Sequence, residues 1–158
     1  MMLDFAEKNS AERANITAQL EAKIQQNTSE FAYFAKLHLA GLALREKDYL
    51  KANECFRFVI DAKSAPALLS DYAKIMLVSI ALDHPEVIAK VELDKYIKDL
   101  DSANTAFIYN AKIIKSLYFI KENKIKEAQE ILASILNSQE VPDVFRVQAA
   151  AIMDSVNF

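Results

Sequence analysis

Residues 47–60, KDYLKANECFRFVI, return in a weaker form as NKIKEAQEILASIL at residues 123–136. The two stretches align as a small residue followed by apolar residues four and seven positions later: Ala52, Phe56 and Val59 in the first copy, Ala128, Leu132 and Ile135 in the second. This spacing places the three residues on one face of a helix. The copies lie 76 residues apart, which suggests a further unit of about 38 residues between them. Recurrence on this scale predicts an array of helical hairpins.

The composition supports the same conclusion. The chain has 158 residues, enough for one domain with a sizeable core, and 53% of them are hydrophobic. It contains one glycine, three prolines and no tryptophan, so turn residues are scarce. This excludes a glycine-rich phosphate loop and disfavours a sheet of hairpins. We therefore expect an all-α chain.

Charge and cysteine content exclude further classes. The net charge is −3, from 19 basic and 22 acidic residues, and the basic residues are scattered singly, which disfavours nucleic acid as a partner. Cys55 has no second cysteine to pair with and is expected to be a small buried hydrophobe. No stretch approaches the ~18 apolar residues of a membrane span, and residues 1–8 do not resemble a signal peptide. As given, the chain is expected to be soluble.

We predict a single helical-repeat domain over residues 1–158. Its expected parts are an N-terminal helix, three helical hairpins and a C-terminal capping helix, over residues 1–26, 27–64, 65–101, 102–140 and 141–158. The N-terminal helix should dock through a narrow stripe of Ile16, Leu20 and Ile24. Residues 27–30, NTSE, predict the cap of the next helix.

Several local features give more detailed expectations. Gly41, inside an apolar helical stretch, suggests that another backbone crosses closely there. Residues 83–85, DHP, should break the helix of the middle hairpin, and Leu93, Ile97 and Leu100 should form the buried face of its return helix. Asp101-Ser102 is expected to start the third hairpin. The capping helix offers one apolar side for closing the array: Val144, Val147, Ala151 and Met153.

Residues 47–52 and Phe56 resemble the return helix of a tetratricopeptide repeat, and Leu39-Ala40 stands where that motif has a leucine and a small residue. The motif tryptophan is missing, Ala43 replaces a usual tyrosine, and the proline comes late, at Pro66. In the third hairpin Lys115 replaces the leucine, although Ser116 keeps the small position. The resemblance implies an α-solenoid of about three degenerate tetratricopeptide-like hairpins with an extra helix at each end.

The whole layout, over residues 10–157, is also similar to a narrower group. With residues 70–75, SDYAKI, opening the middle hairpin, it resembles the soluble domain of bacterial membrane-tethered tetratricopeptide-like proteins, the family that includes the ancillary subunit of the SecYEG translocon. In that family an N-terminal transmembrane helix precedes the repeats. The resemblance implies a location at the extracytoplasmic face of a bacterial inner membrane if such an anchor has been removed, with a cytoplasmic location as the alternative.

The same resemblance implies a non-enzymatic protein–protein interaction module, chaperone-like, that acts beside the secretion translocon or on exported proteins. Its partners would be translocon components or exported proteins, with no cofactor and no nucleic acid. One alternative is a cytoplasmic scaffold subunit of a stable complex. A second is an enzyme or small-ligand carrier with its site in the helical core.

Residues suited to catalysis or metal binding are few. His38 and His84 are far apart in the sequence, and neither belongs to a metal-binding spacing, so no metal is expected. Cys55 has no evident base. The acidic and basic residues between Lys90 and Asp101 are interpreted as a solvated helix face with ion pairs.

The expected binding surface is the concave face formed by the first helix of each hairpin. It is predicted to contain eight residues: Tyr33, Phe34, Leu37, Leu44, Tyr109, Asn110, Ile113 and Leu117. For the tyrosines, packing in the core is the alternative. A face this apolar should not stand open in water. We expect the N-terminal helix or the last helix to cover part of it.

Overall fold

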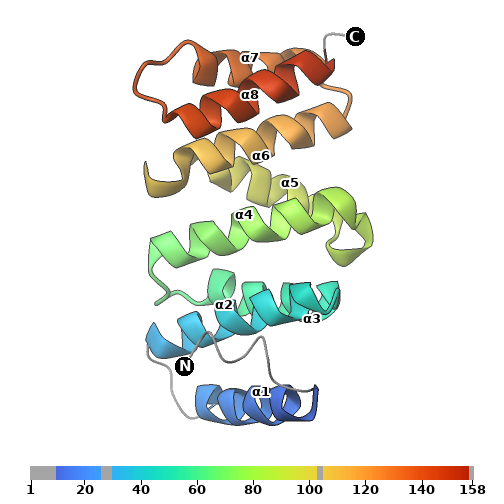
Figure 1. Cartoon of the computed structure of the whole chain (residues 1–158), viewed down its shortest axis with the longest axis vertical. Helices are drawn as coiled ribbons and strands as arrows, with labels where there is room; N and C mark the ends of the chain where they lie inside the picture. Colours follow the sequence, from blue (N-terminus) through green and yellow to red (C-terminus); the bar gives the residue numbers. More distant parts are fainter. Residues whose placement is uncertain (1–9, 26–29, 103–104, 157–158) are drawn as a thin grey trace. The chain divides into compact units, whose positions relative to one another are not determined.

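The computed structural model describes residues 10–25, 30–102 and 105–156 of the chain. Within these residues every regular element is a helix, which confirms the all-helical class (Figure 1). The chain divides into two compact units, Met1–Ala65 and Pro66–Phe158, and each unit has its own set of buried residues.

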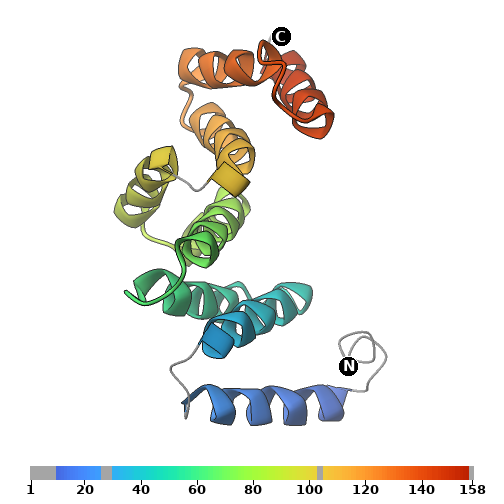
Figure 2. The same ribbon diagram turned by 90° about the vertical axis from the view of Figure 1, so that its left-hand side faces the viewer.

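The first unit contains three described helices: α1 (Ser10–Gln25), α2 (Glu30–Arg45) and α3 (Tyr49–Asp61). α2 and α3 pack closely as a hairpin, and α1 contacts α2 (Figure 2). The predicted face of α3 is confirmed, since Ala52 and Val59 are fully buried and Phe56 is only 1% exposed. Burying a side chain such as Phe56 stabilises the fold by about 1.5–3 kcal/mol.

α1 docks mainly through one residue of its predicted stripe. Ile24 is 5% exposed, whereas Ile16 and Leu20 are half-buried. An ion pair adds to this contact, because the Lys51 ammonium in α3 donates a hydrogen bond to Glu21 at 2.6 Å. This hydrogen bond raises the pKa of Lys51 above its ordinary value.

The expectation for Gly41 is wrong. A Cβ built at Gly41 has no other atom within 4 Å, and the residue is exposed. The buried small residues of this part of α2 are Ala40 and Ala43, on the other side of the helix. Gly41 therefore lies on an uncovered side of α2. The cap predicted from residues 27–29 lies outside the described residues.

The turn between α2 and α3 has a specific geometry. Lys47 adopts the left-handed conformation with φ 59°. The backbone N–H of Asp48 donates to the carbonyl of Ala43 at 2.9 Å. The Asp48 side chain then caps α3 by accepting a hydrogen bond from the N–H of Lys51 at 3.0 Å.

The same turn recurs 76 residues later in the second unit. Asn123 also has φ 59°, and the N–H of Lys124 donates to the carbonyl of Phe119 at 2.8 Å. The residue that caps α7 differs, because Lys124 stands where the first copy has Asp48 and makes no side-chain cap. The repeat seen in the sequence therefore extends to backbone geometry.

The second unit contains five described α-helices and three short 3-10 helices: α4 (Ala67–Asp83), η2 (Pro85–Val87), α5 (Lys90–Asp99), η3 (Leu100–Ser102), η4 (Thr105–Phe107), α6 (Ile108–Lys121), α7 (Ile125–Leu136) and α8 (Asp143–Val156). α4 packs directly on α6, and α5 lies to one side of this pair (Figure 2). α7 packs on α6, and α8 packs on both.

Three expectations for this unit are confirmed. α4 ends at Asp83, and a 3-10 helix begins at Pro85. The predicted face of α5 is buried, with Leu93, Ile97 and Leu100 exposed by 8%, 5% and 4%. In α7 the predicted face is fully buried: Ala128, Leu132 and Ile135.

The start of the third hairpin is not where the sequence suggests. Asp101-Ser102 belongs to η3, and α6 begins only at Ile108. The N–H of Leu100 donates to the carbonyl of Tyr96, the last α-helical bond of α5, and the chain continues directly into η3. The two residues therefore finish one helix instead of starting the next.

The inward face of α8 also differs from the prediction. Val144 and Val147 are 59% and 69% exposed, and Ala151 is exposed too. Of the four predicted residues, Met153 does pack toward α6 and α7, and it does so together with Phe145, Ala149 and Ile152. Val141, just before the helix, is buried in the same cluster. Its anchoring fixes the helix phase, because Phe145 and Ala149 follow it at intervals of four.

Candidate functional site

The predicted binding residues of the first unit have different environments. Tyr33 is 5% exposed, its hydroxyl lies 2.6 Å from Ser64 Oγ, and its ring centroid lies 6.2 Å from that of Phe58. Tyr33 thus belongs to the core, as the alternative interpretation has it. Phe34 is 57% exposed, and Leu37 and Leu44 are half-buried. These three remain candidates for a binding surface.

In the second unit, α8 covers part of the predicted surface. Tyr109 and Ile113 pack against the cluster that holds α8, and the ring centroids of Tyr109 and Phe145 lie 5.4 Å apart. Asn110 is exposed and Leu117 is half-buried. On this side of α6, little apolar surface is free for a partner.

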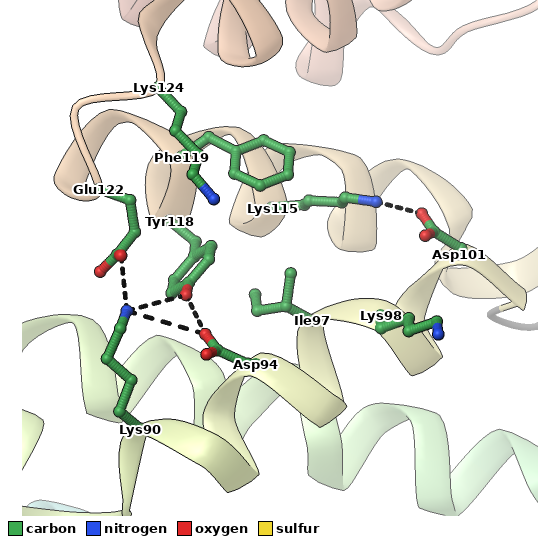
Figure 3. Close-up of a pocket in the computed structure, with 10 residues that line it drawn as sticks. All are labelled: Lys90, Asp94, Ile97, Lys98, Asp101, Lys115, Tyr118, Phe119, Glu122 and Lys124. Carbon is green, nitrogen blue, oxygen red and sulfur yellow. Dashed lines mark hydrogen bonds and ion pairs between the residues drawn. The ribbon is translucent and has the colours of Figure 1, made fainter.

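The largest described cavity of the second unit lies on the opposite side of α6. It measures about 450 Å³ and opens between α5, α6 and the start of α7 (Figure 3). Its lining combines lysines, carboxylates and aromatic side chains: Lys90, Asp94, Ile97, Lys98, Asp101, Lys115, Tyr118, Phe119, Glu122 and Lys124. We refer to this cavity as the lysine groove. It forms because α5 stands aside from α6 along most of its length.

One wall of the lysine groove is an ion cluster around Lys90. The Lys90 ammonium lies 2.6 Å from Glu122, 3.1 Å from the Tyr118 hydroxyl and 3.8 Å from Asp94. The hydrogen bonds to Glu122 and Tyr118 raise the pKa of Lys90 above its ordinary value. This cluster therefore connects α5 to the end of α6 through an ion pair and a hydrogen bond.

Tyr118 completes this wall. Its hydroxyl donates a hydrogen bond to Asp94 and accepts one from Lys90. Burial raises the pKa of Tyr118, and the hydrogen bond to Asp94 raises it further. The hydroxyl is therefore protonated at neutral pH and acts as a fixed donor.

The other wall contains Lys115, Phe119 and Lys124. Lys115 forms an ion pair with Asp101. The Lys115 and Lys124 ammonium groups lie 5.6 Å and 5.7 Å from the centre of the Phe119 ring, within cation–π distance. Phe119 therefore presents an aromatic surface that is flanked by positive charge (Figure 3).

Two of the four lysines have no acidic partner in the part of the chain that the structure describes. Lys90 and Lys115 are engaged with carboxylates, whereas Lys98 and Lys124 are exposed and make no ion pair there. In Figure 3, Lys98 lies at the rim and Lys124 reaches inward beside Phe119. The groove can therefore offer two lysine ammonium groups to a ligand.

Smaller cavities continue the groove in both directions along α6. One, of about 210 Å³, shares Lys90, Tyr118 and Glu122 with it and is otherwise largely apolar. Another, of about 160 Å³, shares Asp101 and Lys115. The three cavities therefore adjoin one another through shared wall residues between Lys90 and Glu122.

The described residues offer binding chemistry more readily than catalytic chemistry. No three histidine, cysteine or acidic side chains among them come together as a metal site. Cys55 is fully buried, and burial raises the pKa of its thiol, which matches the expected small hydrophobe. His84 Nδ1 lies 3.3 Å from Glu86 at the end of α4. Cys55 and His84 do not line the lysine groove.

Comparison with known proteins gives a family. A family model described as "Protein of unknown function (DUF2659)" matches residues 1–156. The chain belongs to the DUF2659 family. It is also similar to the uncharacterized protein RP231 of Rickettsia prowazekii (strain Madrid E), with 29% identity over 157 residues, which are 98% of this chain and 70% of that protein. No solved structure matches the chain.

No described helix of this DUF2659 chain combines the length and apolarity that a bilayer span requires. The lysine groove was not among the sites predicted from its sequence, which assigned residues 90–101 to a solvated face. That interpretation is correct for the Lys90–Asp94 pair within α5. It misses the contacts from α5 to α6. The signal that could have indicated them is Lys115, since a lysine there replaces the apolar residue of the repeat motif.

Proposed function

We propose that this DUF2659 chain is a non-enzymatic protein-binding module, built from degenerate tetratricopeptide-like hairpins, and that it binds a protein segment in the lysine groove. The observation that carries the proposal is the groove itself. It adjoins two smaller cavities, it contains an aromatic ring, and two of its lysines have no acidic partner among the described residues. Such a depression suits an extended or helical segment of a partner.

Two repeated features support the hairpin architecture. The turns at Lys47 and Asn123 have the same φ and the same pattern of backbone hydrogen bonds. The small and apolar residues that follow each turn are buried in the same way. Stacked helical repeats create extended surfaces that such proteins use for binding.

The place of action rests on the resemblance to membrane-tethered tetratricopeptide-like proteins. We propose that the module acts at the extracytoplasmic face of a bacterial inner membrane, beside the secretion translocon or on exported proteins. The alternative is a cytoplasmic scaffold subunit. Protease treatment of spheroplasts distinguishes the two: the full-length native protein is digested without lysis if the proposal is correct, and only after lysis if it is a cytoplasmic subunit.

Photo-crosslinking from the groove tests binding. A photoreactive phenylalanine analogue replaces Phe119 in the full-length protein in its native cells, and the matched control carries it at Val91, which is 84% exposed on α5 and lines no described cavity. We expect a protein adduct from position 119 that is absent from position 91. The purified partner should then bind the wild type and lose affinity for a Phe119→Ser variant.

The result that contradicts the proposal is equally specific. Equal adducts from both positions, or a partner that binds the Phe119→Ser variant as tightly as the wild type, would place recognition elsewhere. The predicted surface of the first unit would then be tested with a Phe34→Ser variant.

A further inference from the structure

We infer that the occupant of the lysine groove is an acidic protein segment whose carboxylates pair with Lys98 and Lys124. This inference rests on the proposed function and names the chemical class of the partner. It starts from the charges of the groove. The lining contains four lysines and three carboxylates, and these carboxylates are already engaged by Lys90 and Lys115.

The remaining charge is local and contrasts with that of the chain. The whole chain carries a net charge of −3, whereas the four lysines and three carboxylates of the lining give the groove a net charge of +1. Charge complementarity of this kind selects partners of opposite sign and accelerates their association. The partner that fits the groove is therefore negatively charged.

Lys124 is a poor residue for the start of α7. It occupies the N-cap of α7, where the matching residue of the first copy, Asp48, caps its helix with a carboxylate. A cation is unfavourable at the positive end of a helix, and lysine provides no capping oxygen. Its compensating contact is the cation–π contact with Phe119 in the wall of the groove, and a local rule broken in this way is typical of a functional site.

The shape of the groove favours a chain segment over a small anion. The flanking cavities of about 210 Å³ and 160 Å³ share walls with the lysine groove, so the depression extends well beyond one carboxylate. Apolar side chains lie beside the lysines, among them Ile97 and Phe119. We expect a segment in which acidic residues are interspersed with apolar ones.

Selection from a random peptide library tests this inference with the full chain. Twelve-residue peptides displayed on phage are selected on the immobilised protein, and the affinity of the enriched peptides is measured by calorimetry. We expect enrichment in aspartate and glutamate. The double variant Lys98→Glu/Lys124→Glu should weaken binding by at least about tenfold, with a smaller loss for Lys98→Gln/Lys124→Gln.

A matched control is available on the same helices. Lys95 and Lys126 are exposed and line no described cavity, so Lys95→Glu/Lys126→Glu changes the charge equally outside the groove. Its affinity should stay within about twofold of the wild type. Far-UV circular dichroism of all variants checks that they fold.

The outcomes separate the inference from the proposed function. Enriched peptides that are not acidic, but that lose affinity for the Phe119→Ser variant, overturn the acidic partner and leave groove binding intact. Succinate that binds as tightly as the peptides also overturns the inference, in favour of a small dicarboxylate. No enriched peptide, or peptides insensitive to every groove variant, overturns both.

Discussion

Lys47 is the clearest case of a residue in a conformation that its side chain disfavours. Its φ of 59° belongs to the left-handed region, which glycine and asparagine enter at lower cost than lysine. The second copy of the turn has Asn123 at the same place with the same angle. The backbone hydrogen bonds of the turn require this conformation whichever residue occupies it.

Replacing Lys47 by glycine should therefore stabilise the protein. We expect Lys47→Gly to raise the free energy of unfolding by about 0.5–1 kcal/mol, measured by urea denaturation, because the removed strain exceeds the added entropy of the unfolded chain. Glu46→Gly is the control. Glu46 has no positive φ, so this change should destabilise. A loss of stability in Lys47→Gly would contradict the interpretation of the turn.

Gly41 gives a second stability prediction in the same unit. Since a Cβ at this exposed helical position meets no other atom within 4 Å, Gly41→Ala should raise the free energy of unfolding by about 0.5–1 kcal/mol. Thermal and urea unfolding both measure it. If the variant is less stable than the wild type, another segment approaches this side of α2.

Tyr118 makes stability depend on alkaline pH. Burial and the hydrogen bond to Asp94 raise its pKa in the folded state above the ordinary 10.0. The stabilising contribution is complete below about pH 10 and is lost as the pH rises through the folded pKa, because the unfolded chain releases the proton first. The pKa of Lys90 is also raised, so its contribution declines in the same direction.

The free energy of unfolding should consequently fall more steeply above about pH 10 in the wild type than in Tyr118→Phe. Urea denaturation at a series of pH values measures both slopes. A spectroscopic titration of tyrosinate in the folded wild type should show a component that ionises above about pH 10 and is missing from the variant. Parallel slopes would show that Tyr118 does not titrate differently in the two states.

At the scale of single helices, α3 and α7 show how one repeated element can be adapted. Their buried faces and preceding turns match, but α3 begins at a capping Asp48 and α7 at an uncapped Lys124. The first arrangement favours stability. The second leaves an ammonium group beside Phe119, where it lines the groove.

A capping residue introduced at the start of α7 should increase stability and weaken binding in the groove. We expect Lys124→Asp to raise the free energy of unfolding by about 0.5–1 kcal/mol, because the new cap outweighs the lost cation–π contact. The same change should lower the affinity for acidic ligands. Urea denaturation and calorimetry measure the two effects. Lys124→Gln, which removes the charge without supplying a short capping side chain, should gain less stability. A less stable Lys124→Asp variant would mean that the contact with Phe119 dominates.

Elements with a strong internal pattern could be predicted from the sequence. α3 and α7 were placed correctly, with their turns and buried faces, because the information is local: a small residue, apolar residues at +4 and +7, and a short polar turn. The phase of α8 was wrong because it depends on Val141, a residue outside the helix, and on how it packs into the cluster of α6 and α7.

The lysine groove could not be predicted for a related reason. Its existence depends on the position of α5 relative to α6, and this position depends on the short elements on either side of α5, η2 and η3. No periodic pattern in residues 90–124 encodes that offset. The sequence shows which side chains are charged, whereas the structure shows which of them face one another.

At the scale of the whole molecule, the two units have unequal sizes and separate sets of buried residues. Cys55 belongs to the smaller unit, is fully buried, and has a thiol pKa that burial raises. It is therefore a chemical reporter of opening in that unit, while helical circular dichroism reports on both units.

We expect the smaller unit to open first in urea, because less surface is buried in a shorter compact segment. Pulsed reaction of Cys55 with a thiol reagent should then show a midpoint at lower urea concentration than the loss of helical signal. A Cys55→Ala variant confirms that the labelling is specific. Coincident midpoints would show that the two units unfold as one cooperative system.

The ionic contacts of Lys90 between α5 and α6 should depend on salt concentration. Part of the join between α5 and α6 consists of the contacts of Lys90 with Glu122, Tyr118 and Asp94, and its ammonium and carboxylate groups are partly open to water. Ions screen exposed charges of this kind, with a Debye length of about 8 Å at physiological ionic strength. We therefore expect higher salt to weaken these contacts between α5 and α6 while both helices stay folded.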